Sequence, residues 1–108
     1  MIFPLIAVYY RVYSTSDVVE VKNPEFSEDP YLGRTLAFRV PPPHLASSLK
    51  RHLCGREGTD HKQAVLFRDI SCLTPLDDSE PAQILERTGI GSTMENPIAL
   101  VLQREAVR

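Results

Sequence analysis

Candidate metal ligands and a candidate nucleophile lie close together in the segment "HLCGREGTDH", which contains His52, Cys54 and His61. Imidazole and thiolate groups are common zinc ligands, and a cysteine paired with a histidine is a common catalytic nucleophile. The spacing of the three residues matches neither a zinc finger nor a helical His-Glu-x-x-His site. His52 and Cys54 are two positions apart, so on a helix they point in different directions. The segment therefore indicates structural side chains rather than a metal site or a catalytic pair.

Two other stretches carry residue types that hold phosphates or cations. "GIGST" is rich in glycine, but it lacks the following lysine and the strand-to-helix setting of a phosphate-binding loop. Asp77, Asp78 and Glu80 favour a solvated loop and a helix cap over a carboxylate dyad or cation ligands. No nucleophile, base and orienting group come together in the sequence, so we expect no enzyme, no metal and no cofactor.

Three cations, Lys50, Arg51 and Arg56, lie along a predicted helix. They form a candidate basic face for an acidic peptide or a phospholipid headgroup, although so few charges give weak, salt-dependent binding. A solvated helix face explains the same residues. The net charge of the chain is −2, and no aromatic platform accompanies the cations, so nucleic-acid binding is not expected.

Size and composition indicate a single domain, residues 1–108. The chain is long enough for one core but short for two domains, and its hydrophobic fraction of 43% is ordinary. The apolar start "MIFPLIAVYYRVY" has no basic region, contains Pro4 and is too short to span a bilayer, so we expect no membrane segment. The two cysteines lie outside any CxxC pattern, which favours an intracellular protein of the cytoplasm or nucleus.

Alternating hydrophobicity predicts a half-buried strand near the start of the chain, with Arg11 on its exposed face. The buried face of this strand is expected to hold Ile6, Val8, Tyr10 and Val12. Residues 15–34 contain two X-Pro steps and several acids, which indicates a long inserted loop with a short strand at 18–21. The exposed edge of that strand offers a route to a homodimer.

The stretch "GRTLAFRVPPPHLASSLKRHLCGREG" predicts a strand, a proline corner and a helix in turn. Three prolines end the strand, because proline donates no hydrogen bond to a sheet. The helix is expected at 44–54, with a left-handed cap at Gly55 or Gly58. The expected buried residues are Leu36, Phe38 and Val40 in the strand, and Leu45, Ala46, Leu49 and Leu53 in the helix.

Two more strands, at 64–70 and 97–105, and a short helix at 82–87 complete the expected elements. The strand residues expected to face the central helix are Val65, Phe67, Ile98, Leu100 and Leu102. Because neighbours in a strand point to opposite faces, Leu66, Ala99 and Val101 are then expected to face outward.

The order of these elements is that of the β-grasp fold. The stretch "GRTLAFRVPPPHLASSLKRHLCGREG" resembles, without a gap, the second strand, proline corner and central helix of ubiquitin-like domains. "AVLFRD" and "IALVLQRE" resemble their third and last strands. The resemblance implies an α+β, ubiquitin-like β-grasp domain with a mixed four- to five-stranded sheet packed on one central helix. The ending "LQREAVR" has no Gly-Gly tail, so a conjugated modifier is not expected.

In ubiquitin-like domains the sheet face opposite the helix commonly receives partners, and the resemblance places an apolar patch there. The candidate partner-binding residues are Leu66, Arg68, Ala99, Val101, Tyr9 and Tyr13. An apolar centre with tyrosine and arginine around it is typical of interfaces, although isolated exposed apolar residues are common and the long loop could cover this face. We therefore expect a non-conjugated ubiquitin-like module of a larger fungal protein that binds a protein partner.

Four short motifs, "YLGR", "PPPH", "LFRDIS" and "PLDD", carry a weaker resemblance. They are similar to ubiquitin-like segments of fungal proteins and to the N-terminal domains of Crinkler-type effectors. This resemblance implies an alternative function, the N-terminal targeting and translocation domain of an effector secreted into a host cell. In that case the acidic segment 15–34 and the tyrosine-rich first strand would carry the signal.

Overall fold

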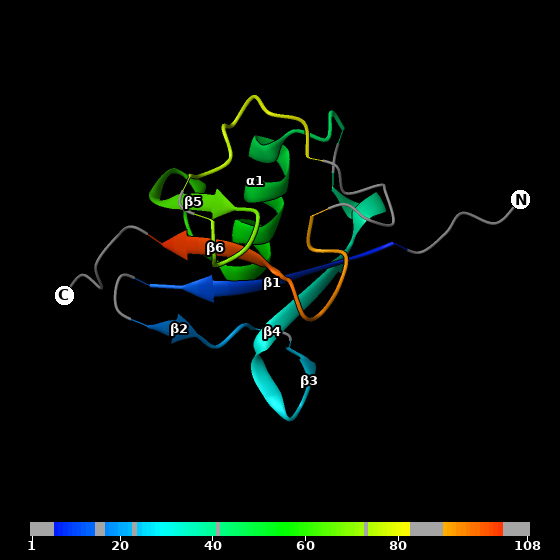
Figure 1. Ribbon diagram of the computed structural model, residues 1–108, viewed down its shortest axis with the longest axis vertical. Coiled ribbons are helices and arrows are strands. Elements are labelled where there is room, and N and C mark those ends of the chain that lie inside the picture. Colours follow the sequence, from blue (N-terminus) through cyan, green and yellow to red (C-terminus); the bar gives the residue numbers. More distant parts are fainter. Residues whose placement is uncertain are drawn as a thin grey trace, which may run out of the picture.

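One helix packs on one face of a mixed sheet in the computed structural model, so the chain has an α+β fold (Figure 1). The structure describes residues 6–14, 17–22, 24–40, 42–72, 74–82 and 90–102. The helix is α1 (Ala46–Glu57), and short 3₁₀ turns lie at Ala37–Arg39 and His61–Gln63. The strands in this part of the chain are β1 (Ala7–Tyr13), β2 (Val18–Val19), β3 (Pro24–Phe26), β4 (Asp29–Leu36), β5 (Ala64–Phe67) and β6 (Ile98–Leu102).

β1 forms the centre of the sheet. Its residues Val8, Tyr10 and Val12 are buried in the core, as the alternating sequence predicts, and Ile6 packs against them. β1 pairs with β4 in antiparallel fashion and with β6 in parallel. β5 adds to the free edge of β6, so the strand order is β3-β4-β1-β6-β5, and β2 pairs with the end of β1. The first and last described strands thus lie side by side (Figure 1).

The segment 15–34 is not a long loop, so that prediction is wrong. It contains β2, β3 and most of β4, and β3 and β4 form an antiparallel hairpin (Figure 1). Pro24 begins β3 at the edge of the sheet, where the missing proline donor removes no ladder bond. The Arg11 guanidinium binds the Asp29 carboxylate through two hydrogen bonds of 2.9 and 3.2 Å. These bonds lower the pKa of Asp29 and tie the start of β4 to β1.

β4 ends at Leu36 rather than at Val40, because a 3₁₀ turn replaces the strand at Ala37–Arg39. A 3₁₀ turn has three residues per turn, so it places Ala37 and Val40 on the same side, and both are buried. Phe38 lies between them and is 63% exposed. The prediction that Phe38 is buried is therefore wrong, because the strand, in which alternate residues share a face, ends at Leu36.

α1 begins and ends later than predicted, and Gly55 lies inside it. Gly58 forms the C-cap with a left-handed φ of 71° and donates its backbone N–H to the carbonyl of Cys54. Ala46, Leu49 and Leu53 of the predicted stripe are buried, whereas Leu45 is only partly buried. The three buried side chains pack against the face of the sheet that carries Val8, Tyr10 and Val12.

The start of α1 is capped by another segment rather than by its own N-cap, Leu45. The backbone N–H of Ala46 donates to the carbonyl of Glu80 at 2.7 Å, and that of Ser47 donates to the carbonyl of Asp78 at 3.1 Å. The Lys50 ammonium also binds the Asp78 carboxylate at 2.9 Å. Segment 78–82 therefore satisfies donors that a helix N-terminus leaves unpaired.

The two faces of β5 are the reverse of those predicted. Leu66 is only 2% exposed and belongs to the core, whereas Val65 and Phe67 are partly exposed. Leu66 is paired with Leu100 of β6, which is also buried, and directly paired residues lie on one face of a sheet. The predictions that Val65 and Phe67 face the helix and that Leu66 faces outward are therefore wrong. The burial of Ile98 and Leu100 is confirmed.

Two expectations fall on residues that the structure does not describe. The expected helix at 82–87 lies outside the described residues except for Ala82, and so do residues 103–105 of the expected last strand. Among the described helices, none combines the length and the apolar character needed to cross a membrane.

Candidate functional site

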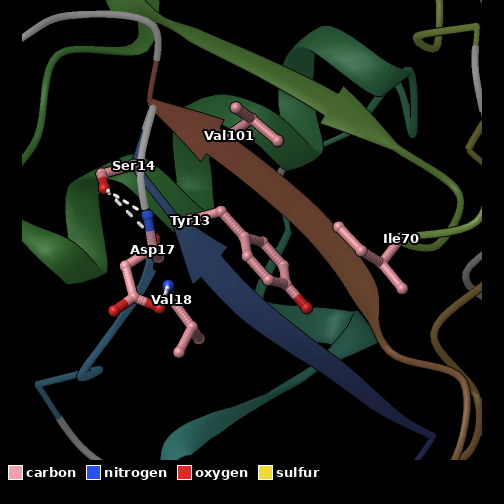
Figure 2. Close-up of a pocket in the computed structure, with 6 residues that line it drawn as sticks. All are labelled: Tyr13, Ser14, Asp17, Val18, Ile70 and Val101. Atoms are coloured by element: carbon pink, nitrogen blue, oxygen red, sulfur yellow. Dashed lines mark hydrogen bonds between the residues drawn. The ribbon is translucent and has the colours of Figure 1, made fainter.

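A shallow apolar pocket lies on the sheet face opposite α1, near the ends of β1 and β6 (Figure 2). We call it the sheet-face pocket, and its volume is about 520 Å³. Figure 2 shows the Tyr13 ring in the middle of the pocket, in front of the sheet, with α1 behind. The residues that line it are Tyr13, Ser14, Asp17, Val18, Ile70 and Val101.

Strand pairing brings the apolar residues of this pocket together. Tyr13 of β1 is paired with Val101 of β6 on one side and with Val18 of β2 on the other. A backbone hydrogen bond holds the polar rim, because the N–H of Ser14 donates to the carbonyl of Asp17 at 2.7 Å. The N–H of Val18 donates to the Asp17 carboxylate, also at 2.7 Å. The pocket therefore combines an apolar floor with a carboxylate at its edge.

Ile70 completes the pocket from the loop that follows β5, and 64% of its surface is exposed. The loop is held by Asp69, whose carboxylate accepts hydrogen bonds from the N–H and hydroxyl of Ser71. Those bonds lower the pKa of Asp69. Ile70 therefore adds exposed apolar surface to the side of the pocket next to Tyr13 and Val101.

The structure brings only part of the predicted partner-binding set to this pocket. Tyr13 and Val101 line it, and Tyr9 lies on the same face of β1. Leu66 lies in the core, and Ala99 is 1% exposed, so the predictions that these two residues are accessible on the sheet face are wrong. Arg68 is exposed, with its guanidinium 3.9 Å from the carboxylate of Glu80. Ile70 and Val18, which the sequence analysis missed, replace the two buried residues.

The three cations of the predicted basic face have different surroundings. Lys50 is paired with Asp78, and its side chain is 12% exposed. Arg51 is exposed to solvent, whereas Arg56 donates to the backbone carbonyl of Arg34 at 3.1 Å. The three cations therefore do not form one surface for an acidic ligand.

A second pocket, which the sequence analysis missed, gathers arginines from three elements. It has a volume of about 390 Å³ and lies where β4, the turn after it and the last turns of α1 meet. We call it the arginine pocket, and its lining residues are Arg34, Thr35, Leu36, Arg39 and Arg56.

His52 and Cys54 of "HLCGREGTDH" have separate environments. His52 Nε2 lies 2.8 Å from the hydroxyl oxygen of Thr35, and burial, followed by the charges of Arg56 and Arg39, lowers its pKa. Cys54 is buried in the core, and this burial raises the pKa of its thiol. Among the described residues, no three potential His, Cys, Asp or Glu ligands come close enough together to hold a metal ion. The arrangement therefore gives neither an activated thiolate nor a ligand cluster.

A buried tyrosine and glutamate link the sheet to the helix. The Tyr10 hydroxyl of β1 donates to Glu57 Oε2 of α1 at 2.7 Å. The backbone N–H of Lys22 donates to Glu57 Oε1 at 3.1 Å, so both carboxylate oxygens are used. Burial, and then the hydrogen bond to Glu57, raises the pKa of Tyr10 to about 12. This pair holds the end of α1 and the segment before β3 to the central strand.

The raised pKa of Tyr10 predicts a loss of stability at high pH. The tyrosine of the unfolded chain loses its proton at the ordinary pKa of 10.0, and the folded protein holds it until about 12. The free energy of unfolding is therefore expected to fall as pH rises through this interval, by at most about 3 kcal/mol. Urea unfolding followed by circular dichroism between pH 9 and pH 12 would measure it. The Tyr10→Phe variant should show a smaller slope, and an equal slope in both proteins would contradict the assignment to Tyr10.

Comparison with known proteins gives no relative for the chain: no family model, curated protein or solved structure matches it.

Proposed function

We propose that this chain is a non-conjugated ubiquitin-like module that binds a protein partner through its sheet face. The strand order supports a β-grasp fold, since the first and last strands run parallel at the centre and α1 packs across them. Antiparallel strands flank this central pair on both sides, as in that fold. The hairpin of β3 and β4, together with β2, is then an elaboration of the first hairpin of the fold.

The observation that carries the proposal is the sheet-face pocket itself. Tyr13, Val18, Ile70 and Val101 present apolar surface on the side of the sheet that α1 does not cover. Tyrosine and aliphatic side chains of this kind form the centre of many protein interfaces. The exposed Asp17 at the edge favours a cation. The occupant we propose is therefore a protein that inserts one apolar side chain and places a lysine or arginine next to it.

The chemistry of the remaining polar residues supports binding rather than catalysis. Cys54 is buried with a raised thiol pKa, and His52 is hydrogen bonded to Thr35. Neither residue reaches the sheet-face pocket, whose lining contains no histidine or cysteine. We place the module inside the cell, in the cytoplasm or nucleus, where the two free thiols remain reduced.

Charge substitutions in the pocket test the proposal. Val101→Arg and Ile70→Asp are expected to keep the fold, because both side chains are partly or largely exposed. Partners captured from cells of the source organism with the wild-type protein would be identified, purified and titrated against each variant. We expect affinity to fall about 30-fold, which corresponds to the 2 kcal/mol of a hot-spot residue.

Phe26→Asp is the matched control, since Phe26 is an exposed apolar residue on the hairpin of β3 and β4. Its affinity for the same partner should equal that of the wild-type protein. A partner that binds Val101→Arg and Ile70→Asp as tightly as the wild-type protein would exclude the sheet-face pocket. Loss of binding in Phe26→Asp alone would move the interface to the inserted hairpin, and would favour the alternative function as an effector targeting domain.

A further inference from the structure

The arginine pocket concentrates positive charge on a chain whose overall charge is −2. Arg34 comes from β4, Arg39 from the 3₁₀ turn and Arg56 from the last turn of α1. Arg34 and Arg39 are close in sequence, but Arg56 lies 17 residues after Arg39, so the fold brings the helix arginine to the other two. A cluster of this kind is not a by-product of a generally basic surface, because acidic residues outnumber lysine and arginine in this chain by 14 to 12.

Among the described residues, a carboxylate pairs with only one of the three guanidinium groups. Arg34 Nε binds the Glu25 carboxylate at 2.9 Å. No carboxylate of the described residues lies within ion-pair distance of Arg39 or Arg56. The pocket therefore carries about two uncompensated positive charges, and both of them act on the neighbouring imidazole of His52.

The cations are held in place before any ligand arrives. Arg56 Nη2 donates to the carbonyl of Arg34 at 3.1 Å, and the Arg39 guanidinium lies over the Phe38 ring, 5.5 Å from its centroid. Arg56 Nε is buried and has no acceptor among the described residues, which is a costly state for a charged donor. An anion in the pocket would meet fixed donors and would lose little affinity to side-chain ordering.

We propose that the arginine pocket binds a phosphate monoester dianion carried on a protein, such as a phosphoserine side chain. Two uncompensated guanidinium groups match the two negative charges of a phosphate monoester at neutral pH, whereas a carboxylate would neutralise one. The planar fork of arginine also pairs with two phosphate oxygens at once. This proposal does not rest on the sheet-face pocket, which lies elsewhere and shares no residue with it.

A protein-borne phosphate fits the pocket better than a lipid headgroup. Recruitment to an anionic membrane commonly uses clusters of about four to eight cations close to the surface. Here two cations are uncompensated, and the net charge of −2 repels an anionic membrane. A single phosphorylated side chain needs only the donors that the pocket supplies.

The test is a nuclear magnetic resonance titration with N-acetylphosphoserine amide, with N-acetylserine amide and inorganic phosphate as comparison ligands. We expect saturable shifts at Thr35 and His52 with both phosphates and none with the serine compound. Arg39→Gln and Arg56→Lys should each weaken binding about tenfold, the effect of losing one charge-assisted hydrogen bond. Arg51→Gln, an exposed cation of the same helix outside the pocket, should bind like the wild-type protein.

His52 supplies a second readout that a purely structural role of the arginines would not give. It faces Thr35 of β4, Arg39 of the turn and Arg56 of its own helix. A bound dianion would offset both charges, so the pKa of His52 should rise on binding. An unchanged His52 titration, or equal weakening by Arg51→Gln, would overturn the proposal. Binding of phosphoinositide vesicles without binding of the phosphoserine compound would also overturn it, in favour of a lipid.

Discussion

Leu66→Arg is expected to unfold the protein, whereas Val65→Arg, one residue away, is expected to leave it folded. Leu66 lies in the core against Leu100, so the substitution removes a buried leucine and leaves an unpaired cation among apolar side chains. The first effect alone costs about 2–5 kcal/mol, and an unpaired buried charge adds several more. The sum is comparable with the whole stability of a small domain, about 5–15 kcal/mol.

Circular dichroism during thermal and urea unfolding would measure both variants. Val65 lies on the opposite, partly exposed face of β5, so its arginine can extend into solvent at a cost of about 1–2 kcal/mol. The reverse result, a folded Leu66→Arg and an unfolded Val65→Arg, would show that Val65 rather than Leu66 faces the helix.

Gly33→Ala is expected to be the most damaging single-methyl substitution in the sheet. A Cβ at this position would lie 2.5 Å from Cζ of Tyr10 and 2.9 Å from both Cε atoms of the ring. The ring cannot simply move aside, because its hydroxyl is bonded to Glu57 and its sides are packed in the core. We expect a loss of about 1–3 kcal/mol in the free energy of unfolding, as overpacking of a core commonly causes.

Gly55→Ala is the matched control for this variant. Gly55 lies inside α1, and a Cβ there would have no neighbour within 4 Å. Alanine is the better helix former, so this variant should be more stable than the wild-type protein by about 0.5–1 kcal/mol. Urea unfolding of both variants gives the two values. A Gly33→Ala protein as stable as the wild type would mean that Tyr10 does not pack on β4 as the structure has it.

The elements with a long, one-sided pattern could be predicted from the sequence. Val8, Tyr10 and Val12 alternate with Arg11, and the buried stripe of α1 contains Leu49 and Leu53. In β5 every residue of "AVLF" is apolar, so its hydrophobic pattern does not distinguish its two faces. The pairing of Leu66 with Leu100 determines which face of β5 is buried, and this pairing is a tertiary contact.

The amino-acid composition of residues 15–34 is the reason that most of their strands were not predicted from the sequence. Pro24, Pro30 and several acids are typical of loops. Pro24 lies in β3 at the edge of the sheet, and Pro30 lies near the start of β4, before the residues that pair with β1. A strand at the edge needs only one side of its backbone paired. Turn residues therefore do not exclude a strand in such a position.

Two of the six residues that line the sheet-face pocket could be predicted from the sequence. Tyr13 and Val101 follow from the alternation of β1 and β6 once the parallel pairing is assumed. Ile70 comes from a loop whose path no periodicity describes, and the arginine pocket joins three elements. Such sites depend on how elements are placed against one another, which a single sequence does not encode locally.

The parallel pairing of β1 with β6 also determines how the protein responds to tension. The entrance to β1 and the exit from β6 lie at opposite ends of this pair, since both strands run in the same direction. A force that pulls these two points apart would slide the strands along each other, and their hydrogen bonds would carry the load together. A hairpin pulled at its open end breaks its bonds one after another. Stretching along the chain is therefore resisted by the centre of the sheet.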